Sequence, residues 1–378
     1  MQKFNLKTDV NFGANALECL RLLDGNQALI IADEMMVKLG FVQQVSDVLQ
    51  TGGFKSTLFS EVLPDPDIKI VTRGIEKMMQ NLPDVIVAIG GGSVIDTAKG
   101  MLYIYAKMEE NTQSQLPKLV AIPTTSGTGS EVTAFSVITV NGEKLCLVDE
   151  QMMPDYAIVD PNFVKTVPAS VTAETGLDAL SHAIEAYVST QATDFTDALA
   201  EKAIKLLFDY LLPVYQDGNN MEAREKVHHA STLAGIAFTN ASLGITHSLA
   251  HAIGGRFHLP HGRAIGILLP HVIAYNSHLA TGDLQSVAAQ KYAQLANLIG
   301  LPAKTTLEGC QNLIRGIRVL LQELQVNLSF RDDQLDRNAY EESLVTLAQL
   351  ALADNCTPTN PRQPTEQELV ELVKKAYE

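Results

Sequence analysis

The sequence predicts two domains of different class, an α/β N-terminal domain with a parallel sheet and an all-α C-terminal domain. Three observations predict this division. Short apolar runs alternate with helical stretches as far as Pro161. One of these runs leads directly into the turn Gly90-Gly91-Gly92-Ser93. After Pro168, almost only helical periodicity remains. We expect the two domains to comprise residues 1–170 and 171–378.

Composition and charge exclude several classes of protein. With 378 residues, of which 46% are hydrophobic and 19% charged, the chain can build two cores. The net charge of -15 argues against nucleic acid or an anionic membrane as a partner. Four cysteines form no C-x-x-C pair, which favours a reducing cytoplasm over a disulfide framework. The first residues, MQKFNLKTDV, lack the apolar stretch of a signal peptide, and no apolar run is long enough for a transmembrane helix.

The N-terminal domain is predicted to alternate strands and helices. Apolar runs that end at turn residues indicate buried strands, and longer amphipathic stretches indicate helices. The expected strands are 27–33, 56–60, 84–89 and 119–122, and the expected helices are 37–50, 68–80 and one that begins at about Val94. Such alternation predicts a parallel sheet covered on both faces.

The glycine turn after the strand at 84–89 is a candidate phosphate site. Glycines let backbone N–H groups approach a phosphate, and the start of the following helix adds a positive dipole end. Ser93 and Asp96 also have the S-x-x-D spacing of a capping box, so a tight, well-capped turn is the alternative. The pattern is not G-x-G-x-x-G and therefore differs from the ordinary Rossmann fingerprint.

Two further features of this domain suit a dinucleotide. The loop PTTSGTGS at 123–130 follows a strand and is rich in hydroxyls and glycines, as a ligand-binding loop or a plain turn would be. Asp33 ends a strand, where its carboxylate can bind a ribose diol and repel a 2′-phosphate. This favours NAD over NADP, and helix capping is the alternative role for Asp33.

The C-terminal half reads as a series of helices. The expected helices are 172–188, 194–211, 221–240, 245–252, 279–299, 306–323, 340–352 and 366–377. Within this half, the stretch LGITHSLAHAIGGRFHLPHG at 243–262 holds four of the nine histidines. His247 and His251 are four residues apart and share a helical face. Gly254-Gly255 should end or bend that helix, which would leave His261 beyond a turn.

A carboxylate completes the candidate metal site. Asp178 and His182 are four residues apart on an otherwise apolar helical face, where an unpaired carboxylate would be costly and a metal would stabilise it. We therefore expect Asp178, His182, His247 and His261 to be metal ligands, with Glu185 either behind them or facing solvent. One carboxylate and three imidazoles suit Fe(II) or Zn(II).

Several motifs together resemble the iron-dependent (group III) alcohol dehydrogenases, a family that includes lactaldehyde reductase and propanol and butanol dehydrogenases. The motifs are GLDALSHAIEAY at 176–187, THSLAH at 246–251, PHGRAIGILLPHV at 260–272, GGGSVIDTAK at 90–99, IPTTSGTGSEVT at 122–133 and TNPR at 359–362. The resemblance runs along essentially the whole chain. It implies a dehydroquinate synthase-like architecture, a dinucleotide-binding domain followed by a helical domain, and in many members a homodimer.

The resemblance also implies roles for individual residues. His251 would be the non-ligand histidine that takes part in proton transfer, and Asp33 would bind the ribose of NAD. The remaining cofactor contacts would be Gly91, Gly92, Ser93, Thr124, Thr125, Thr128 and Lys144. Phe135, Phe238 and Cys356 would line a pocket for a small alcohol or aldehyde.

Other functions remain open at this point. A zinc glycerol dehydrogenase would share the metal and cofactor residues and differ in metal and substrate. A lyase of the dehydroquinate synthase type should carry several basic residues near the histidines, where only Arg256 and Arg263 are found. A non-catalytic nucleotide-binding or scaffold protein would leave the four candidate ligands and His251 without a purpose.

Overall fold

The computed structural model describes residues 3–109, 116–140 and 143–378, with the backbone alone at residues 109, 143 and 144. The chain forms two compact units, Met1–Val167 and Pro168–Glu378. Each unit has its own core, and each is considered separately below.

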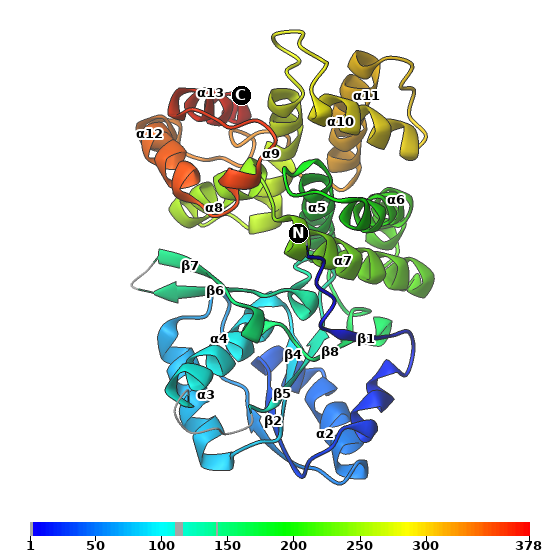
Figure 1. Cartoon of the computed structure of the whole chain (residues 1–378), viewed down its shortest axis with the longest axis vertical. Helices are drawn as coiled ribbons and strands as arrows, with labels where there is room; N and C mark the ends of the chain where they lie inside the picture. Colours follow the sequence, from blue (N-terminus) through cyan, green and yellow to red (C-terminus); the bar gives the residue numbers. More distant parts are fainter. Residues whose placement is uncertain (1–2, 110–115, 141–142) are drawn as a thin grey trace. The chain divides into compact units, whose positions relative to one another are not determined.

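A parallel sheet of six strands forms the centre of the N-terminal unit (Figure 1). The strands are β1 (Asp9–Phe12), β2 (Gln27–Ile31), β3 (Lys55–Phe59), β4 (Val85–Gly90), β5 (Lys118–Pro123) and β8 (Tyr156–Val159), in the order β1-β8-β5-β4-β2-β3. All five strand pairings are parallel, which confirms the predicted sheet. The carboxyl ends of β4 and β5 meet, because Gly90 pairs with Pro123. The glycine turn and the hydroxyl-rich loop therefore leave the sheet at the same edge.

Helices cover both faces of this sheet, as the sequence predicts. They are α1 (Glu34–Lys38), α2 (Phe41–Thr51), α3 (Ile68–Asn81) and α4 (Gly92–Glu109). Alternate strand residues face two separate cores: Ile30 packs with Val45 of α2, whereas Leu29 packs with Ile75 of α3. The prediction of one helix over 37–50 was wrong. Gly40 has a φ of 76°, and this left-handed residue separates α1 from α2.

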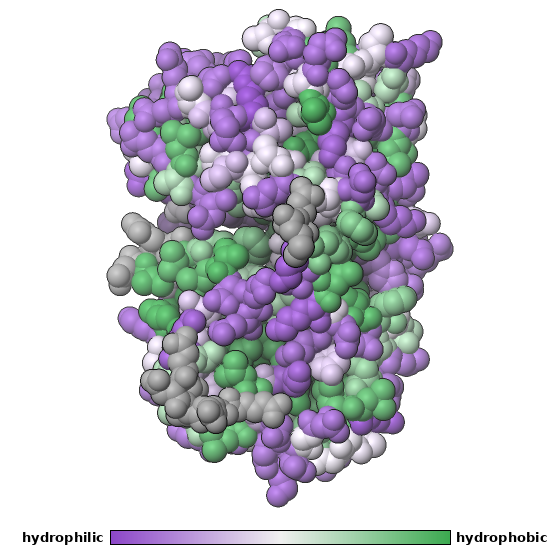
Figure 2. Space-filling model, viewed as in Figure 1, coloured by the Kyte–Doolittle hydropathy of each residue, from purple (hydrophilic) through white to green (hydrophobic). Residues whose placement is uncertain are grey.

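An antiparallel hairpin, β6 (Phe135–Val140) paired with β7 (Glu143–Val148), accompanies the sheet and was not predicted. Leu145 and Val148 of β7 are about half exposed, at 49% and 53%. Figure 2 shows apolar residues gathered over this hairpin. An exposed apolar strand lacks the clear in–out alternation by which a strand is found in a sequence.

The C-terminal unit is helical throughout its regular structure. Its α-helices are α5 (Ala169–Val188), α6 (Asp194–Gln216), α7 (Met221–Ala241), α8 (Ile245–Phe257), α9 (His261–Asn276), α10 (Val287–Leu298), α11 (Thr306–Glu323), α12 (Arg337–Ala353) and α13 (Glu366–Tyr377). The helix α9 was missed by the sequence prediction, and the helix expected over 279–299 begins only at Val287. The predicted end of the helix at about residue 252 was also wrong, since α8 runs through Gly254-Gly255 to Phe257.

Helix α5 lies at the centre of this unit, in contact with α6, α7 and α9. Every residue from Gly176 to Val188 is buried, including Asp178, His182 and Glu185. A second core joins α8 and α9 to α12 and α13. In the described residues, no helix is both long and apolar enough to cross a membrane.

Candidate functional site

Asp178 is the centre of a cluster of imidazoles in the C-terminal unit. Its Oδ1 lies 3.6 Å from Nε2 of His182, one helical turn away on α5. The same oxygen lies 3.5 Å from Nε2 of His247 on α8 and 3.5 Å from Nε2 of His261 at the start of α9. The structure thus brings together all four residues that the sequence suggested as ligands. Within this group, the ligand atoms of Asp178, His247 and His261 all lie within 4.8 Å of one another.

Aromatic contacts order the imidazoles of this cluster. The ring of His182 is stacked between Phe238 and His247, with ring centroids 4.4 and 4.6 Å apart. His251, on the same face of α8 as His247, stacks on His261 at 5.3 Å. Phe238, a predicted pocket residue, therefore lies directly beside the cluster.

The residues of the cluster fit a divalent metal ion. Asp178 is 5% exposed and His247 is 1% exposed. Asp178 Oδ1 and His247 Nε2 have no hydrogen-bond partner among the described residues. Buried polar atoms without partners are costly, and a metal ion would satisfy both. Four tetrahedral bonds of about 2.1 Å separate the ligand atoms by roughly 3.4 Å, close to the distances found around Asp178 Oδ1.

The imidazoles also stabilise the charged form of the carboxylate that they surround. Burial alone would raise the pKa of Asp178, but the neighbouring His182, His247 and His261 hold that pKa well below its usual range. For His247, burial opposes the charge, yet the carboxylates of Glu185 and Asp178 raise its pKa to about 9. An ionised carboxylate among imidazoles is the state that a metal site requires.

Glu185 fixes both His247 and the start of α8. One of its oxygens, Oε2, lies 2.6 Å from His247 Nδ1 and accepts a hydrogen bond from the Gly244 N–H at 3.1 Å. The other oxygen accepts the Thr246 N–H at 2.7 Å. Because Nδ1 of His247 is bonded to the carboxylate of Glu185, Nε2 is the ring nitrogen that faces Asp178. Asn360 assists by accepting the Ile245 N–H at 3.3 Å.

His251 has a carboxylate partner of its own. Its Nδ1 lies 2.8 Å from Oδ2 of Asp354. The other oxygen of Asp354 accepts hydrogen bonds from the Cys356 N–H at 2.8 Å and from the Ser248 hydroxyl at 3.3 Å. Cys356, another predicted pocket residue, is thereby held next to His251. The sequence analysis missed Asp354 and Asn360, although both lie in or next to the segment that contains the TNPR motif.

In the N-terminal unit, the predicted cofactor residues form a second group. The Thr124 N–H donates to the Gly90 carbonyl at 3.0 Å, which joins the loop after β5 to the turn after β4. A Cβ at Gly92 would lie 2.8 Å from Thr128, and one at Gly91 would lie 3.5 Å from Thr125. The structure therefore brings the turn Gly90-Gly91-Gly92 against the three threonines. Glycine is needed at 92, where the loop leaves no room for a side chain.

The remaining cofactor predictions have different outcomes. The capping box was wrong, because α4 begins at Gly92 and Ser93 lies inside it, while Asp96 binds Ser130 and Val137 instead. Asp33 follows β2 and caps α1 by accepting the Met36 N–H at 2.9 Å. The side chain of Lys144 lies outside the described residues. Phe135 is the first residue of β6, in the N-terminal unit.

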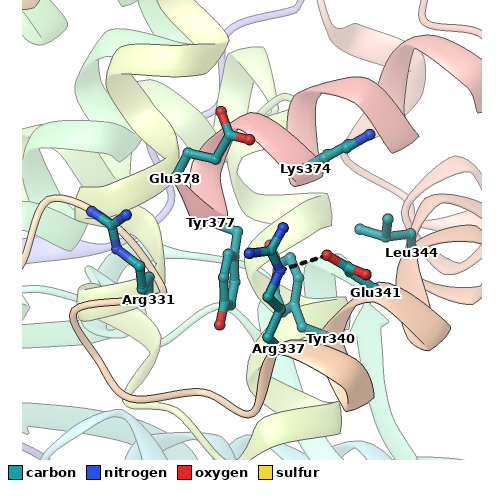
Figure 3. A pocket seen from close by; sticks show the side chains of 8 residues that line it. All are labelled: Arg331, Arg337, Tyr340, Glu341, Leu344, Lys374, Tyr377 and Glu378. Carbon is teal, nitrogen blue, oxygen red and sulfur yellow. Dashed lines mark hydrogen bonds and ion pairs between the residues drawn. The ribbon is translucent and has the colours of Figure 1, made fainter.

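Other residues of the C-terminal unit line a pocket of about 300 Å³. Figure 3 shows its lining: Arg331, Arg337, Tyr340, Glu341, Leu344, Lys374, Tyr377 and Glu378. Arg337 pairs with Glu341 at 2.8 Å, and the two tyrosine hydroxyls donate to backbone carbonyls of Val373 and Leu335. The Tyr340 bond joins α12 to α13, and none of the candidate site residues lines the pocket.

Two family models match nearly all of the chain. The model described as iron-containing alcohol dehydrogenase matches residues 7–161. The model for the C-terminal part of the iron-containing alcohol dehydrogenase family matches residues 172–377. The chain belongs to the iron-containing alcohol dehydrogenase family. The sequence resemblance is therefore confirmed.

Individual members of the family are similar over the whole chain. Aldehyde-alcohol dehydrogenase 2 of Entamoeba histolytica is 39% identical over 100% of this chain and 47% of its own length. The chain thus spans about half the length of the first curated relatives it matches. The 1-propanol dehydrogenase PduQ of Citrobacter freundii is 40% identical over 99% of this chain and 100% of its own length.

A solved family structure has the same fold. The crystal structure of a 1,3-propanediol oxidoreductase is 34% identical to this chain, covers 100% of both chains and has a TM-score of 0.91. The dehydroquinate synthase-like architecture expected from the resemblance is confirmed.

Proposed function

We propose that the chain is a metal-dependent oxidoreductase that interconverts a small primary alcohol and its aldehyde by hydride transfer to or from NAD(H). One observation carries the proposal: three imidazole nitrogens, drawn from three helices, lie around one buried carboxylate oxygen. Asp178, His182, His247 and His261 would hold Fe(II) or Zn(II). When bound, such an ion supplies Lewis acidity that polarises the substrate oxygen.

His251 would carry the proton of the reaction. The carboxylate of Asp354 at 2.8 Å makes Nδ1 the protonated nitrogen, so Nε2 is free to take or release a proton. The bond to Asp354 also fixes the orientation of the ring. Phe238, beside His182, and Cys356, beside Asp354, would line the substrate pocket.

The N-terminal domain, residues 1–170, would bind the dinucleotide, and the C-terminal domain, residues 171–378, would bind the metal. The backbone of Gly91, Gly92 and Ser93 at the start of α4 would hold the pyrophosphate, where the helix dipole favours an anion. Thr124, Thr125 and Thr128 would contact the adenosine side, with Lys144 near the phosphates. Asp33 would bind the ribose and disfavour NADP by charge repulsion.

The proposal also includes the cellular compartment and the oligomeric state of the protein. None of the four cysteines, all of which the structure describes, is in a disulfide, which supports a reducing compartment such as the cytoplasm. The family resemblance supports a homodimer. Light scattering of the purified protein would measure the oligomeric state.

A lyase of the dehydroquinate synthase type is less well supported. Such an enzyme needs free cationic side chains for an anionic substrate. Here Arg263 is paired with Glu174 at 2.8 Å and with Asp333 at 3.3 Å, and Arg256 donates to Ser343. A zinc glycerol dehydrogenase differs from the proposal only in its metal and in its preference for polyols.

An absorbance assay of NADH tests the proposed function. The full chain, reconstituted with Fe(II) or with Zn(II), is given short alcohols, aldehydes and glycerol. We expect turnover of short primary alcohols and aldehydes, with His251→Ala keeping its metal but losing about 100-fold or more in kcat, the usual scale for a proton-transfer residue. Turnover of glycerol alone would favour the polyol dehydrogenase, and no turnover with either metal would contradict the proposal.

A further inference from the structure

Lys99 is a completely buried lysine in α4, in the helix that begins at the glycine turn. Its Nζ donates three hydrogen bonds: to the Ser130 hydroxyl at 2.9 Å, the Thr133 hydroxyl at 3.1 Å and the Phe135 carbonyl at 2.8 Å. An ammonium group has three N–H donors. Each donor therefore has an acceptor, and all three acceptors lie in one short segment after β5.

Asp96, three residues earlier on the same helix, holds this segment from a second direction. Its Oδ1 accepts the Ser130 hydroxyl at 2.7 Å, and its Oδ2 accepts the Val137 N–H at 3.0 Å. Its backbone carbonyl accepts the Ser136 hydroxyl at 2.9 Å. The Ser130 hydroxyl thus receives a hydrogen bond from Lys99 and donates one to Asp96. Residues 130–137 are thereby tied to α4 by side chains of opposite charge.

Ser130, which takes part in these bonds, also contacts a residue assigned to the cofactor site. The Ser130 N–H donates to the Thr128 hydroxyl at 3.3 Å. Thr128 in turn packs against Gly92, where an added Cβ would approach to 2.8 Å. A continuous chain of contacts therefore runs from the buried charges, through Ser130 and Thr128, to the glycine turn.

Stability alone does not account for two buried charges at this position. A buried ion pair contributes little more than a well-packed apolar pair of the same volume, because both ions lose their hydration. What the two side chains do provide is five directional bonds to four groups between Ser130 and the first residues of β6. Directional bonds of charged groups specify geometry, and geometry is what a phosphate-binding loop requires.

We propose that Lys99 and Asp96 are positioning residues that hold the loop at 123–130 against the glycine turn in the conformation that binds the dinucleotide. This inference rests on the proposed function, because it takes these two segments as the cofactor site. Neither residue needs to touch the cofactor. Their effect would therefore appear in cofactor affinity, with the metal centre of the other unit unchanged.

The test measures NADH binding by nicotinamide fluorescence in the wild-type chain and three variants. Lys99→Met removes the ammonium, and the double variant Lys99→Met/Asp96→Asn removes the charges of both residues at nearly constant volume, so that Asp96 is not left as a charge without Lys99. Lys118→Met is the matched control, since it removes a lysine of the same unit whose ion pair with Asp155 is exposed. Melting temperature and metal content are measured for each protein.

We expect the double variant to fold, to keep its metal content and to bind NADH at least about tenfold more weakly, which corresponds to about 1.4 kcal/mol. Its KM for NAD should rise while kcat at saturating NAD stays near the wild-type value. Lys118→Met should bind NADH normally. A folded double variant with an unchanged dissociation constant would overturn the inference.

Two other results are also decisive. A double variant that does not fold would overturn the inference, because the pair would then be needed for the fold itself. A wild-type chain that binds no NADH would overturn the proposed function and this inference together.

Discussion

The carboxylate of Asp33 is placed for two roles, and only one of them requires its negative charge. It caps α1 through the Met36 N–H, and it stands at the carboxyl end of β2. A cap requires an oxygen acceptor, which Asn supplies as well as Asp does. Repulsion of a 2′-phosphate requires the negative charge, which Asn lacks.

Asp33→Asn should therefore keep the stability of the protein and relax its discrimination against NADP. We expect the ratio of kcat/KM for NADP to that for NAD to rise about tenfold, as for the loss of one nearby like charge. Asp67→Asn is the control, because Asp67 caps α3 through the Ile70 N–H in the same way. An Asp33→Asn protein with the wild-type cofactor ratio would show that capping is the only role of this residue.

Cofactor binding should depend on the protonation of Lys99. Burial lowers the pKa of Lys99 to about 8, although the facing groups Asp96, Glu131 and Cys146 favour its charge. A neutral amine has two N–H donors for the three oxygens that the ammonium bonds. We expect the dissociation constant for NADH to increase as the pH rises above about 8, and this increase to be absent in Lys99→Met/Asp96→Asn.

Unfolding would not explain such a loss of affinity. The pKa of Lys99 is lower in the folded chain than the ordinary value of 10.5, so between these two pH values the unfolded chain binds more protons. This group therefore makes the fold more stable as the pH rises through that range. Thermal melting at pH 7.5 and about pH 9 would separate the two effects. An NADH affinity that does not change over that range would contradict the prediction.

Pairs of site residues could be predicted from the sequence where the two partners are close along the chain. Asp178 and His182 were paired by their spacing of four residues, and His247 and His251 by the same spacing. Asp354 was missed because it lies 103 residues from His251, its partner. The interaction of Lys99 with Ser130 was missed for the same reason, since hydrogen bonds between distant segments leave no periodic pattern.

At the scale of elements, the junction between α5 and α9 places His261. Gly262 follows His261 in the first turn of α9 and lies against the backbone of α5, where a Cβ would overlap the Glu174 carbonyl. The close approach of the two helices thus depends on the missing side chain. Any residue larger than glycine must push α9, and His261 with it, away from Asp178.

Gly262→Ala should weaken metal binding and destabilise the fold by about 1–3 kcal/mol, the usual cost of overpacking. Gly255→Ala is the matched control: Gly255 is an exposed position of α8 with no atom near the added Cβ. There alanine should stabilise the helix by about 0.5–1 kcal/mol. Metal titration and chemical denaturation of both variants would check this, and a Gly262→Ala protein with wild-type affinity would contradict it.

There are physical reasons why some elements were not predicted from the sequence. Helix α9 contains Pro270 and follows Pro260, and prolines interrupt a helical pattern in a sequence. Here Pro260 stands at the N-cap, where the first N–H groups of a helix need no partner within the helix. Helix α8 continues through Gly254-Gly255 because most of the residues before them are buried and packing outweighs propensity. The strands β1 and β8 have four residues each, too few for a clear periodic signal.

At the scale of the whole molecule, the sequence predicts the two classes of unit but not their internal arrangement. Alternation of strands and helices predicts a parallel sheet, yet nothing in the sequence orders the strands as β1-β8-β5-β4-β2-β3. That order matters for function, because it makes β4 and β5 neighbours and so brings the glycine turn to the threonine loop. Family membership in turn depends on motifs from both units, since the two matching models divide the chain between them.

We propose above that Asp178 and three histidines of the C-terminal unit hold one divalent ion. The most direct test of this proposal is elemental analysis of the full chain, purified without oxygen and titrated with Fe(II) or Zn(II), beside the variants Asp178→Asn and His247→Ala. The account predicts one tightly bound ion per wild-type chain and a loss of affinity of at least about 10–100-fold in each variant. A wild-type chain that binds no ion, or variants that retain it at full occupancy and affinity, would contradict the account.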